Sequence, residues 1–220
     1  NLLNAEEVEV EEEDEKEEVE EKEEEIEEKD EEKEETVEEP SSILEENSAN
    51  SSVYPIEKSM NFLQNKWSYY YHLSNDKNWN LDSYKYVMEN IDSVETLIGV
   101  NETVTDNIIK NCMLFVMKKG ITPMWEDPQN RQGGCFSYKV VNKTVTSVWR
   151  KLMYLLCGNS LTVDPKHNEY VNGITISPKK GFCIVKIWMK NCKLQDPTII
   201  TNIDGLMKNG CLFKAHCPEF

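Results

Sequence analysis

The chain has 220 residues and a formal net charge of −17, and this charge is distributed unevenly. Residues 1–50 hold 26 acidic residues against four Lys, a net of −22, whereas residues 51–220 hold 15 acidic and 20 basic residues, a net of +5. The length is that of one domain plus an appendage, and a mildly basic domain suits a ligand that carries phosphates. No apolar run approaches the roughly 18 residues of a membrane span, so we expect no membrane partner.

The first part of the chain differs in composition from the rest. Residues 6–39 are almost entirely Glu with a few interspersed Lys, and such a segment cannot bury enough apolar surface to offset the entropy of ordering. We therefore expect a disordered acidic tail over residues 1–50, a linker over residues 51–60 and a folded domain over residues 61–220.

Several stretches of the expected domain are typical of β-strands. In residues 66–73, three aromatic residues alternate with Ser68, Tyr70 and His72, a period of two that indicates a strand. Further strands are expected at about residues 112–118, 135–141, 172–177 and 182–190, and near residues 211–216.

Three helices are expected between and after these strands. Residues 92–100 open with Asp-Ser and continue with apolar residues at helical spacing, and residues 147–157 carry an apolar face that ends at Gly158. Residues 198–209, before Gly210, are expected to form the third helix. Because strands outnumber helices and lack βαβ spacing, we predict an α+β fold with an antiparallel sheet covered on one face by helices.

The cysteine pattern and the absence of catalytic motifs limit the chemistry. Seven cysteines form no CxxC pair, which indicates reduced thiols in a cytosolic protein. Cys211, His216 and Cys217 have a spacing that fits no common zinc pattern. The chain also has no Gly-rich phosphate loop, no HExxH and no paired catalytic carboxylates. We therefore expect a protein that is not an enzyme and holds neither a metal nor a cofactor.

Two tryptophans in polar loops suggest a site for a flat base. Trp79 and Trp125 can enclose an aromatic ligand, where stacking is worth roughly 1–3 kcal/mol per base. A cationic base adds a cation–π energy of roughly 0.5–2 kcal/mol for each indole. Glu126 can accept hydrogen bonds from the N1–H and N2–H groups of guanine, so 7-methylguanine fits best. The alternative is that both tryptophans fold back onto the core and Glu126 is a solvated loop acid.

The other tryptophans lie in predicted strands and helices. Strand alternation places Ile184, Lys186 and Trp188 on one face of residues 182–190. Trp188 is expected either in the core or at the ligand. Trp67 and Trp149 are expected in the core.

Several segments together resemble a known family. The order and spacing of Gln64-Asn65-Lys66-Trp67, Asn75–Trp79, Gly120–Asp127, Gly133-Gly134 and Ile187-Trp188 are similar to those of the eukaryotic translation initiation factor 4E family, the mRNA 5′-cap-binding proteins. The resemblance covers about residues 61–220. It implies a single curved antiparallel sheet, with about three helices on its convex face and the cap slot on its concave side.

The resemblance also implies roles for particular residues. Trp79 and Trp125 would stack the cap base, Glu126 would read its edge, and Trp188 would touch its N7-methyl end. Of three basic positions that contact cap phosphates in the family, two are lost here, to Cys135 and Ile184. The expected substitutes are Lys179, which stands at the third position, with Lys180 and Lys186. The alternative for each Lys is an ordinary solvated side chain.

The surface for partner proteins departs from the family pattern as well. The family binds partner helices through residues that fall here on Val94, Ile98, Arg150, Lys151 and Tyr154. Because an acidic patch has become basic, we expect weak binding of the Arg- and Lys-bearing consensus peptides. A divergent scaffold protein of the initiation factor 4G type is the expected partner.

These features predict a cytoplasmic protein that binds the 7-methylguanosine cap of mRNA and acts in translation initiation. One alternative is a repressor of translation that sequesters caps, and another is a protein-interaction module with a degenerate cap slot. The Asn-, Lys-, Ile- and Tyr-rich composition of the domain favours an AT-rich genome, such as that of a virus or a parasite.

Overall fold

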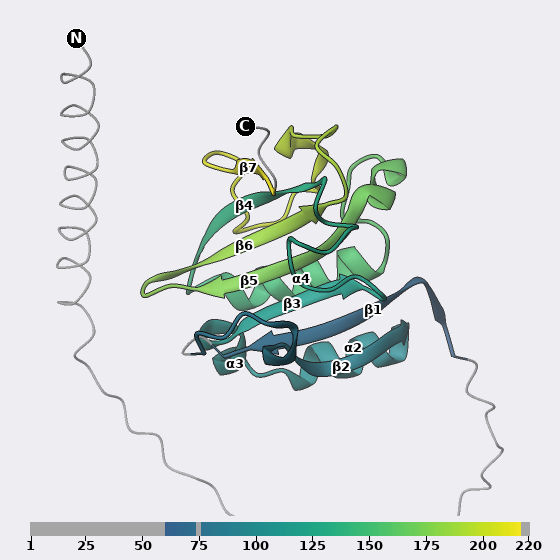
Figure 1. Cartoon of the computed structure of the whole chain (residues 1–220), viewed down its shortest axis with the longest axis vertical. Helices are drawn as coiled ribbons and strands as arrows, with labels where there is room; N and C mark the ends of the chain where they lie inside the picture. Colours follow the sequence, from purple (N-terminus) through teal and green to yellow (C-terminus); the bar gives the residue numbers. More distant parts are fainter. Residues whose placement is uncertain (1–59, 74–75, 217–220) are drawn as a thin grey trace, which may run out of the picture. The chain divides into compact units, whose positions relative to one another are not determined.

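A seven-stranded antiparallel sheet, with the strand order β2-β1-β3-β5-β6-β4-β7, organises the chain (Figure 1). The computed structural model describes residues 60–73 and 76–216, so the expected acidic tail, nearly all of the expected linker and Cys217 lie outside it. The strands are β1 (Phe62–His72), β2 (Lys85–Ser93), β3 (Met113–Lys118), β4 (Gly134–Val141), β5 (Val171–Pro178), β6 (Phe182–Met189) and β7 (Leu212–Ala215). The helices are α2 (Val94–Thr103), α3 (Asp106–Asn111) and α4 (Val145–Cys157), with short 3-10 turns η1 (Leu81–Ser83), η2 (Pro165–Tyr170) and η3 (Pro197–Ile199).

The three helices cover one face of the sheet, behind the strands in Figure 1. Alternate strand residues point toward them, and the resulting core includes Trp67, Tyr69 and Trp149, all at most 2% exposed. The Trp149 indole N–H donates to the hydroxyl of Tyr69 at 3.1 Å, so α4 is tied to β1 inside this core. The predicted fold class and the core positions of Trp67 and Trp149 are confirmed.

The opposite face of the sheet, here called the open face, carries a smaller apolar cluster. Tyr70, Phe115, Met117 and Trp188 come from three strands and pack with Ile121 from the loop after β3. The strand alternation that placed Trp188 and Lys186 on one face is confirmed, because Val185 and Ile187 between and beside them belong to the core under the helices. The open face is therefore the side on which loops can build a site over apolar strands.

The predicted helix over residues 198–209 is wrong. Only Pro197–Ile199 form a short 3-10 turn, and the segment beyond it is irregular. Ile200, Ile203 and Leu206 have helical spacing and are buried, but Gly205 adopts a left-handed φ of 86° that interrupts a helix. Burial of every third residue in an extended segment therefore imitated a helical pattern.

Two elements have no counterpart in the sequence prediction. The edge strand β2 is partly exposed and pairs with β1 through several register shifts, so its residues show no clear alternation. The helix α3 has only six residues and begins after the cap Thr105, whose hydroxyl accepts from the N–H of Ile108. No described helix is long and apolar enough to cross a membrane.

Candidate ligand-binding cleft

Two loops on the open face enclose a cleft of roughly 260 Å³. Residues 76–84 follow β1 and residues 119–133 follow β3, and the floor comes from β3, β5 and β6. The lining residues are Trp79, Tyr84, Met113, Phe115, Pro123, Met124, Trp125, Glu126, Thr175, Ser177, Lys186 and Trp188. The cleft therefore brings together all four residues that the sequence predicts for a base.

The loop that carries Trp125 and Glu126 is fixed from within by Asn130. The side chain of Asn130 is fully buried, and its amide N–H groups donate to the backbone carbonyls of Thr122 (3.0 Å) and Met124 (2.8 Å). Its amide oxygen accepts from the side chain of Asn172 on β5 at 2.9 Å. Because Met124 directly precedes Trp125, this network fixes the backbone position from which the Trp125 side chain extends.

Asp127 closes the same loop. Its carboxylate accepts from the backbone N–H and hydroxyl of Thr122 at 2.8 and 2.7 Å and from the N–H of Gln129 at 2.8 Å. Partial burial alone would raise the pKa of Asp127, but these hydrogen bonds favour the charged form and hold the pKa below its usual value. Asp127 therefore stabilises the loop, whereas the adjacent Glu126 lines the cleft.

The end of this loop lies directly against β6. A Cβ atom on Gly133 would collide with the backbone carbonyl of Met189, so only glycine permits this approach. The next residue, Gly134, starts β4 in register with Met189. The paired glycines thus bind the Trp125 loop to the strand that carries Trp188.

Trp79 forms the opposite wall of the cleft. Its side chain is 51% exposed, and one face of the indole stacks on the ring of His72, with centroids 4.3 Å apart and planes 1° apart. Trp125 is 45% exposed on the other wall. Both indoles therefore keep accessible surface at one cleft, and neither is folded into the core.

Trp188 forms the floor and is 8% exposed. Its indole N–H donates to the hydroxyl of Thr175 on β5 at 2.6 Å, and the ring of His216 lies 4.7 Å from it. Cys135 on β4 is its partner in the antiparallel ladder. The indole is thus held by a hydrogen bond and a ring contact, with part of its edge left at the cleft.

The electrostatics of the cleft are set by one acid and one Lys. Within residues 60–73 and 76–216, no hydrogen bond or ion pair occupies the Glu126 carboxylate. Burial, and then the negative charge of Glu126, raises the pKa of Tyr84, which places that charge toward the cleft. Burial lowers the pKa of His216, the Asn130 carbonyl opposes this shift, and the charge of Lys186 adds to it. The cleft therefore presents the Glu126 carboxylate, which has no hydrogen-bond or ion-pair partner among the described residues, together with the cation of Lys186.

The three predicted phosphate lysines are placed differently. Lys186 lines the cleft, beside Thr175 and Ser137 in the ladders of β5 and β4. Lys179 and Lys180 lie exposed in the turn between β5 and β6, just beyond the lining residue Ser177, and do not line the cleft. Of the three lysines that the sequence predicts for phosphate contact, only Lys186 therefore lines the cleft.

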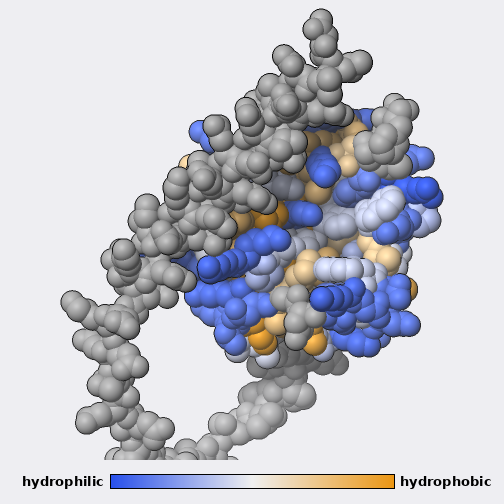
Figure 2. Space-filling model, turned by 60° about the vertical axis from the view of Figure 1, so that its left-hand side comes forward, coloured by the Kyte–Doolittle hydropathy of each residue, from blue (hydrophilic) through white to orange (hydrophobic). Residues whose placement is uncertain are grey.

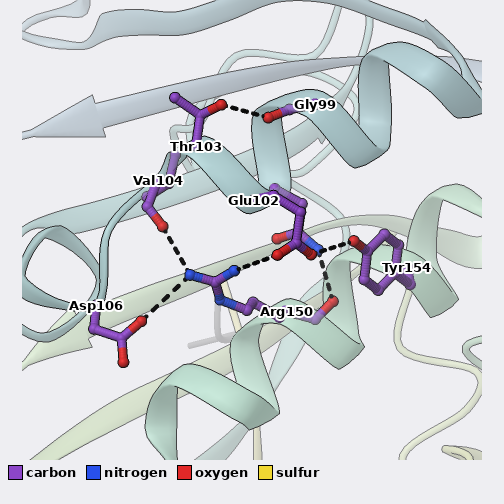
Figure 3. A network of polar contacts seen from close by, with 8 residues as sticks. Gly99, Glu102, Thr103, Val104, Asp106, Arg150 and Tyr154 are labelled. Atoms are coloured by element: carbon purple, nitrogen blue, oxygen red, sulfur yellow. Dashed lines mark hydrogen bonds and ion pairs between the residues drawn. The ribbon is translucent and has the colours of Figure 1, made fainter. Parts of the chain in front are cut away.

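On the helical face, Arg150 lies at the centre of a polar network (Figure 3). Its guanidinium contacts the carboxylates of Glu102 at 3.0 Å and Asp106 at 3.3 Å and donates to the carbonyl of Val104 at 3.1 Å. Glu102 also accepts from the hydroxyl of Tyr154 at 2.7 Å. Two carboxylates, from α2 and α3, therefore compensate the charge of Arg150 on this face.

The remaining residues predicted for partner contacts stay at the surface. Val94 is 37% and Ile98 47% exposed on α2, and Lys151 is exposed on α4. The surface in Figure 2 is largely hydrophilic, with separate apolar areas. The helical face therefore combines two exposed apolar residues, Val94 and Ile98, with the ion pairs of Arg150.

A second and larger hollow of about 360 Å³ lies between the start of β1 and η2. Its lining is polar and has no aromatic ring, and the ammonium of Lys118 there donates to the backbone carbonyls of Asn168 and Glu169. Burial lowers the pKa of Lys118. A hollow of this kind offers no surface on which a base can stack, so size alone does not identify the site.

Sequence reasoning missed several residues of the cleft. Strand alternation could have identified Phe115 and Thr175, because each lies two residues from an open-face position of its strand, Met117 and Gly173 respectively. His72, which lies behind the cleft, shares strand parity with Tyr70 on the open face. Tyr84 carries no such signal, because its role depends on how the loop after β1 folds back.

Comparison with known proteins agrees with this arrangement. Residues 62–216 match the profile of the family described as "Eukaryotic initiation factor 4E". A relative from Acanthamoeba polyphaga mimivirus, named a eukaryotic translation initiation factor 4E homolog, is 38% identical over 40% of this chain and 29% of its own length. The eukaryotic translation initiation factor 4E of Aplysia californica is 28% identical over 62% of this chain and 64% of its own. The matched parts therefore span less than two thirds of these relatives.

Solved structures show the same fold. The structure of C. elegans eIF4E-3 with the 4E-binding protein Mextli and a cap analog is 26% identical, covers 61% of this chain and 76% of its own, and superposes with a TM-score of 0.54. Schistosome eIF4E complexed with m7GpppG and 4E-BP is also 26% identical, covers 62% and 75% of the two chains and gives a TM-score of 0.54.

Proposed function

Since the chain belongs to the eukaryotic initiation factor 4E family, we propose that it binds the 7-methylguanosine 5′ cap of mRNA and acts in translation initiation. The observation that carries this proposal is that Trp79, Trp125 and Glu126, from two separate loops, line one cleft. Two accessible indoles and a carboxylate that no described residue engages are the groups that a cationic guanine base needs. The proposed place of action is the cytoplasm, because capped mRNA is translated there.

The size of the cleft fits one base and little more. At roughly 260 Å³ it lies just below the usual range of ligand pockets, about 300–1,000 Å³. The base would enter between the indoles while the sugar and phosphates stay at the rim, near Lys186. Trp188 would meet the methylated edge from the floor. Binding of this kind forms and breaks no covalent bond, so the proposal includes no catalytic step.

The proposal predicts a preference for the methylated base. Cation–π energies of roughly 0.5–2 kcal/mol for each of two indoles correspond to about fivefold to several hundredfold tighter binding of 7-methyl-GTP than of GTP. Tryptophan fluorescence titrations with both nucleotides measure this ratio. Trp79→Ala and Trp125→Ala should each abolish most of the preference, whereas Lys166→Ala, at the distant polar hollow, should leave it unchanged.

Two results decide against cap binding. Equal quenching by GTP and 7-methyl-GTP, or no quenching by either, would favour a protein-interaction module with a degenerate slot. A preference that survives both tryptophan substitutions would place the ligand elsewhere.

A second candidate function, sequestration of caps without recruitment of the translation machinery, is favoured by the altered helical face. Arg150 occupies a position where the family carries an apolar residue, and it is engaged by Glu102 and Asp106. Recovery of the protein on 7-methyl-GTP beads from a translating extract distinguishes the two functions. Co-recovery of a scaffold protein supports initiation, and recovery of the protein without a scaffold protein supports sequestration.

A further inference from the structure

His72 is the only fully buried imidazole among the described residues, and it lies directly behind the cleft. Its ring covers the inner face of Trp79 with planes 1° apart, while the rest of the indole lines the cleft. Tyr84, which also lines the cleft, packs against the same imidazole at 5.3 Å. His72 therefore contacts the wall of the site and touches no ligand position itself.

A hydrogen bond joins the same ring to the backbone of the loop. The Nε2 atom of His72 lies 2.8 Å from the carbonyl oxygen of Asn78, the residue before Trp79. A carbonyl can only accept, so Nε2 carries the proton. The Nδ1 atom is buried without a partner among residues 60–73 and 76–216. The hydrogen bond to the Asn78 carbonyl therefore comes from Nε2–H.

The other described hydrogen bonds of residues 76–84 are local. Asn78 donates to Asp76 and Asn80 donates to Asn78, so both bonds stay within the loop. By contrast, His72 belongs to β1, which is paired on both sides by β2 and β3. The imidazole is therefore a direct link between the sheet and the Trp79 indole, and Tyr84 adds a ring contact to Phe115 of β3.

We propose that His72 is a positioning residue, which holds the Trp79 indole in its ligand-binding plane before the base enters. It does so by ring stacking and by the hydrogen bond to the Asn78 carbonyl. This inference rests on the proposed function, because it assigns Trp79 to base stacking. A wall that is ordered in advance lowers the entropy cost of binding, since the indole does not have to be fixed by the ligand.

Two substitutions separate the two contacts. His72→Phe keeps a flat ring and removes the hydrogen bond, which should weaken 7-methyl-GTP binding about two- to tenfold. His72→Gln keeps an N–H donor and removes the ring stack, with an expected loss of about the same size. His167→Gln, a substitution at a His in η2 far from the cleft, is the matched control and should not change the affinity. Thermal melts identify the temperature range in which every variant is folded.

A double-mutant cycle distinguishes positioning from a general structural effect. In a Trp79→Ala background, the His72 substitutions should change affinity by less than about twofold, because the residue they position is gone. Equal weakening with and without Trp79, or no weakening in either background, would overturn the proposal.

A measurement without ligand separates this inference from the proposed function. The indole N–H signal of Trp79 in an NMR spectrum is assigned by its loss in Trp79→Phe. It should shift in His72→Gln, because the ring current of the stacked imidazole is removed, and an unchanged signal would overturn the positioning role. If the unmodified protein does not prefer 7-methyl-GTP, the proposed function fails while this signal still tests the stack.

Discussion

Cys135 on β4 faces Trp188 on β6 across the antiparallel ladder, so a small uncharged thiol occupies the open-face position beside the floor of the cleft. The side chain is 6% exposed, and its one hydrogen-bond contact among the described residues is with the hydroxyl of Ser137 at 3.8 Å. The family pattern has an Arg here, which would offer a planar fork to phosphate oxygens. Its absence leaves Lys186 as the cation of the cleft.

Cys135→Arg should therefore tighten binding of 7-methyl-GTP about tenfold, because charge-assisted hydrogen bonds contribute about 1.5–3 kcal/mol. Binding of 7-methylguanosine, which has no phosphate, should stay the same. Calorimetric titration with both ligands measures the difference. An equal gain for the nucleoside would show that the Arg acts on the base or the fold instead.

Lys186→Ala should weaken 7-methyl-GTP binding about two- to fivefold and make it less sensitive to salt, because one phosphate contact is removed. Lys179→Ala should have a smaller effect, since Lys179 lies beyond the lining of the cleft. Titrations at low and high salt test both variants. A larger effect of Lys179 would restore the order expected from the sequence.

Glu126→Gln should weaken binding of 7-methyl-GTP about ten- to a hundredfold, because hydrogen bonds to a charged partner contribute about 1.5–3 kcal/mol. The melting temperature should be unchanged, since no described group bonds to this carboxylate. Glu169→Gln, at an exposed acid on η2, is the matched control. A loss of stability in Glu126→Gln would mean that the acid supports the loop.

Asp127→Asn should instead lower the free energy of unfolding by about 1–2 kcal/mol near neutral pH, because a carboxylate with three hydrogen bonds is lost. The pKa of Asp127 is lower in the folded state. Its stabilisation is therefore present above the unfolded value of about 4 and is lost as the pH falls through the folded value. Denaturation across acid pH should show a weaker pH dependence in the variant than in the unmodified protein.

Arg150→Leu should destabilise the protein by about 1–2 kcal/mol, because it leaves Glu102, Asp106 and the carbonyl of Val104 without their shared donor. The guanidinium side chain is 23% exposed, so solvent replaces it only in part. Lys151→Leu, on the exposed neighbour, should change stability by less than about 0.5 kcal/mol. Chemical denaturation compares the two.

The sequence was sufficient where a pattern is local and regular. Alternation located β1, β3, β4, β5 and β6, and capping signals located α2 and α4. The edge strand β2 was missed because exposure on an edge removes alternation, and the buried triplet Ile200, Ile203 and Leu206 imitated a helix.

The residues of the cleft also divide into those that the sequence predicts and those that depend on the tertiary structure. Trp79, Trp125 and Glu126 stand out as polar-loop aromatics beside an acid, and they line one cleft as expected. The stack of His72 on Trp79 and the ion pairs of Arg150 depend on how distant segments meet, which no spacing along the chain encodes. The roles of the individual residues in cap binding remain predictions for the titrations above.

The two walls of the cleft are anchored unequally. The Trp125 loop is bonded at Asn130 and Asp127 and lies too close to the Met189 carbonyl for any side chain at Gly133. Among the described residues, the loop that carries Trp79 is joined to the sheet by ring contacts of Trp79 and Tyr84 and by the hydrogen bond between His72 and the Asn78 carbonyl. Entry and exit of a nucleotide should therefore be gated from the Trp79 side, and substitutions there should alter the residence time of the ligand more than those on the opposite wall.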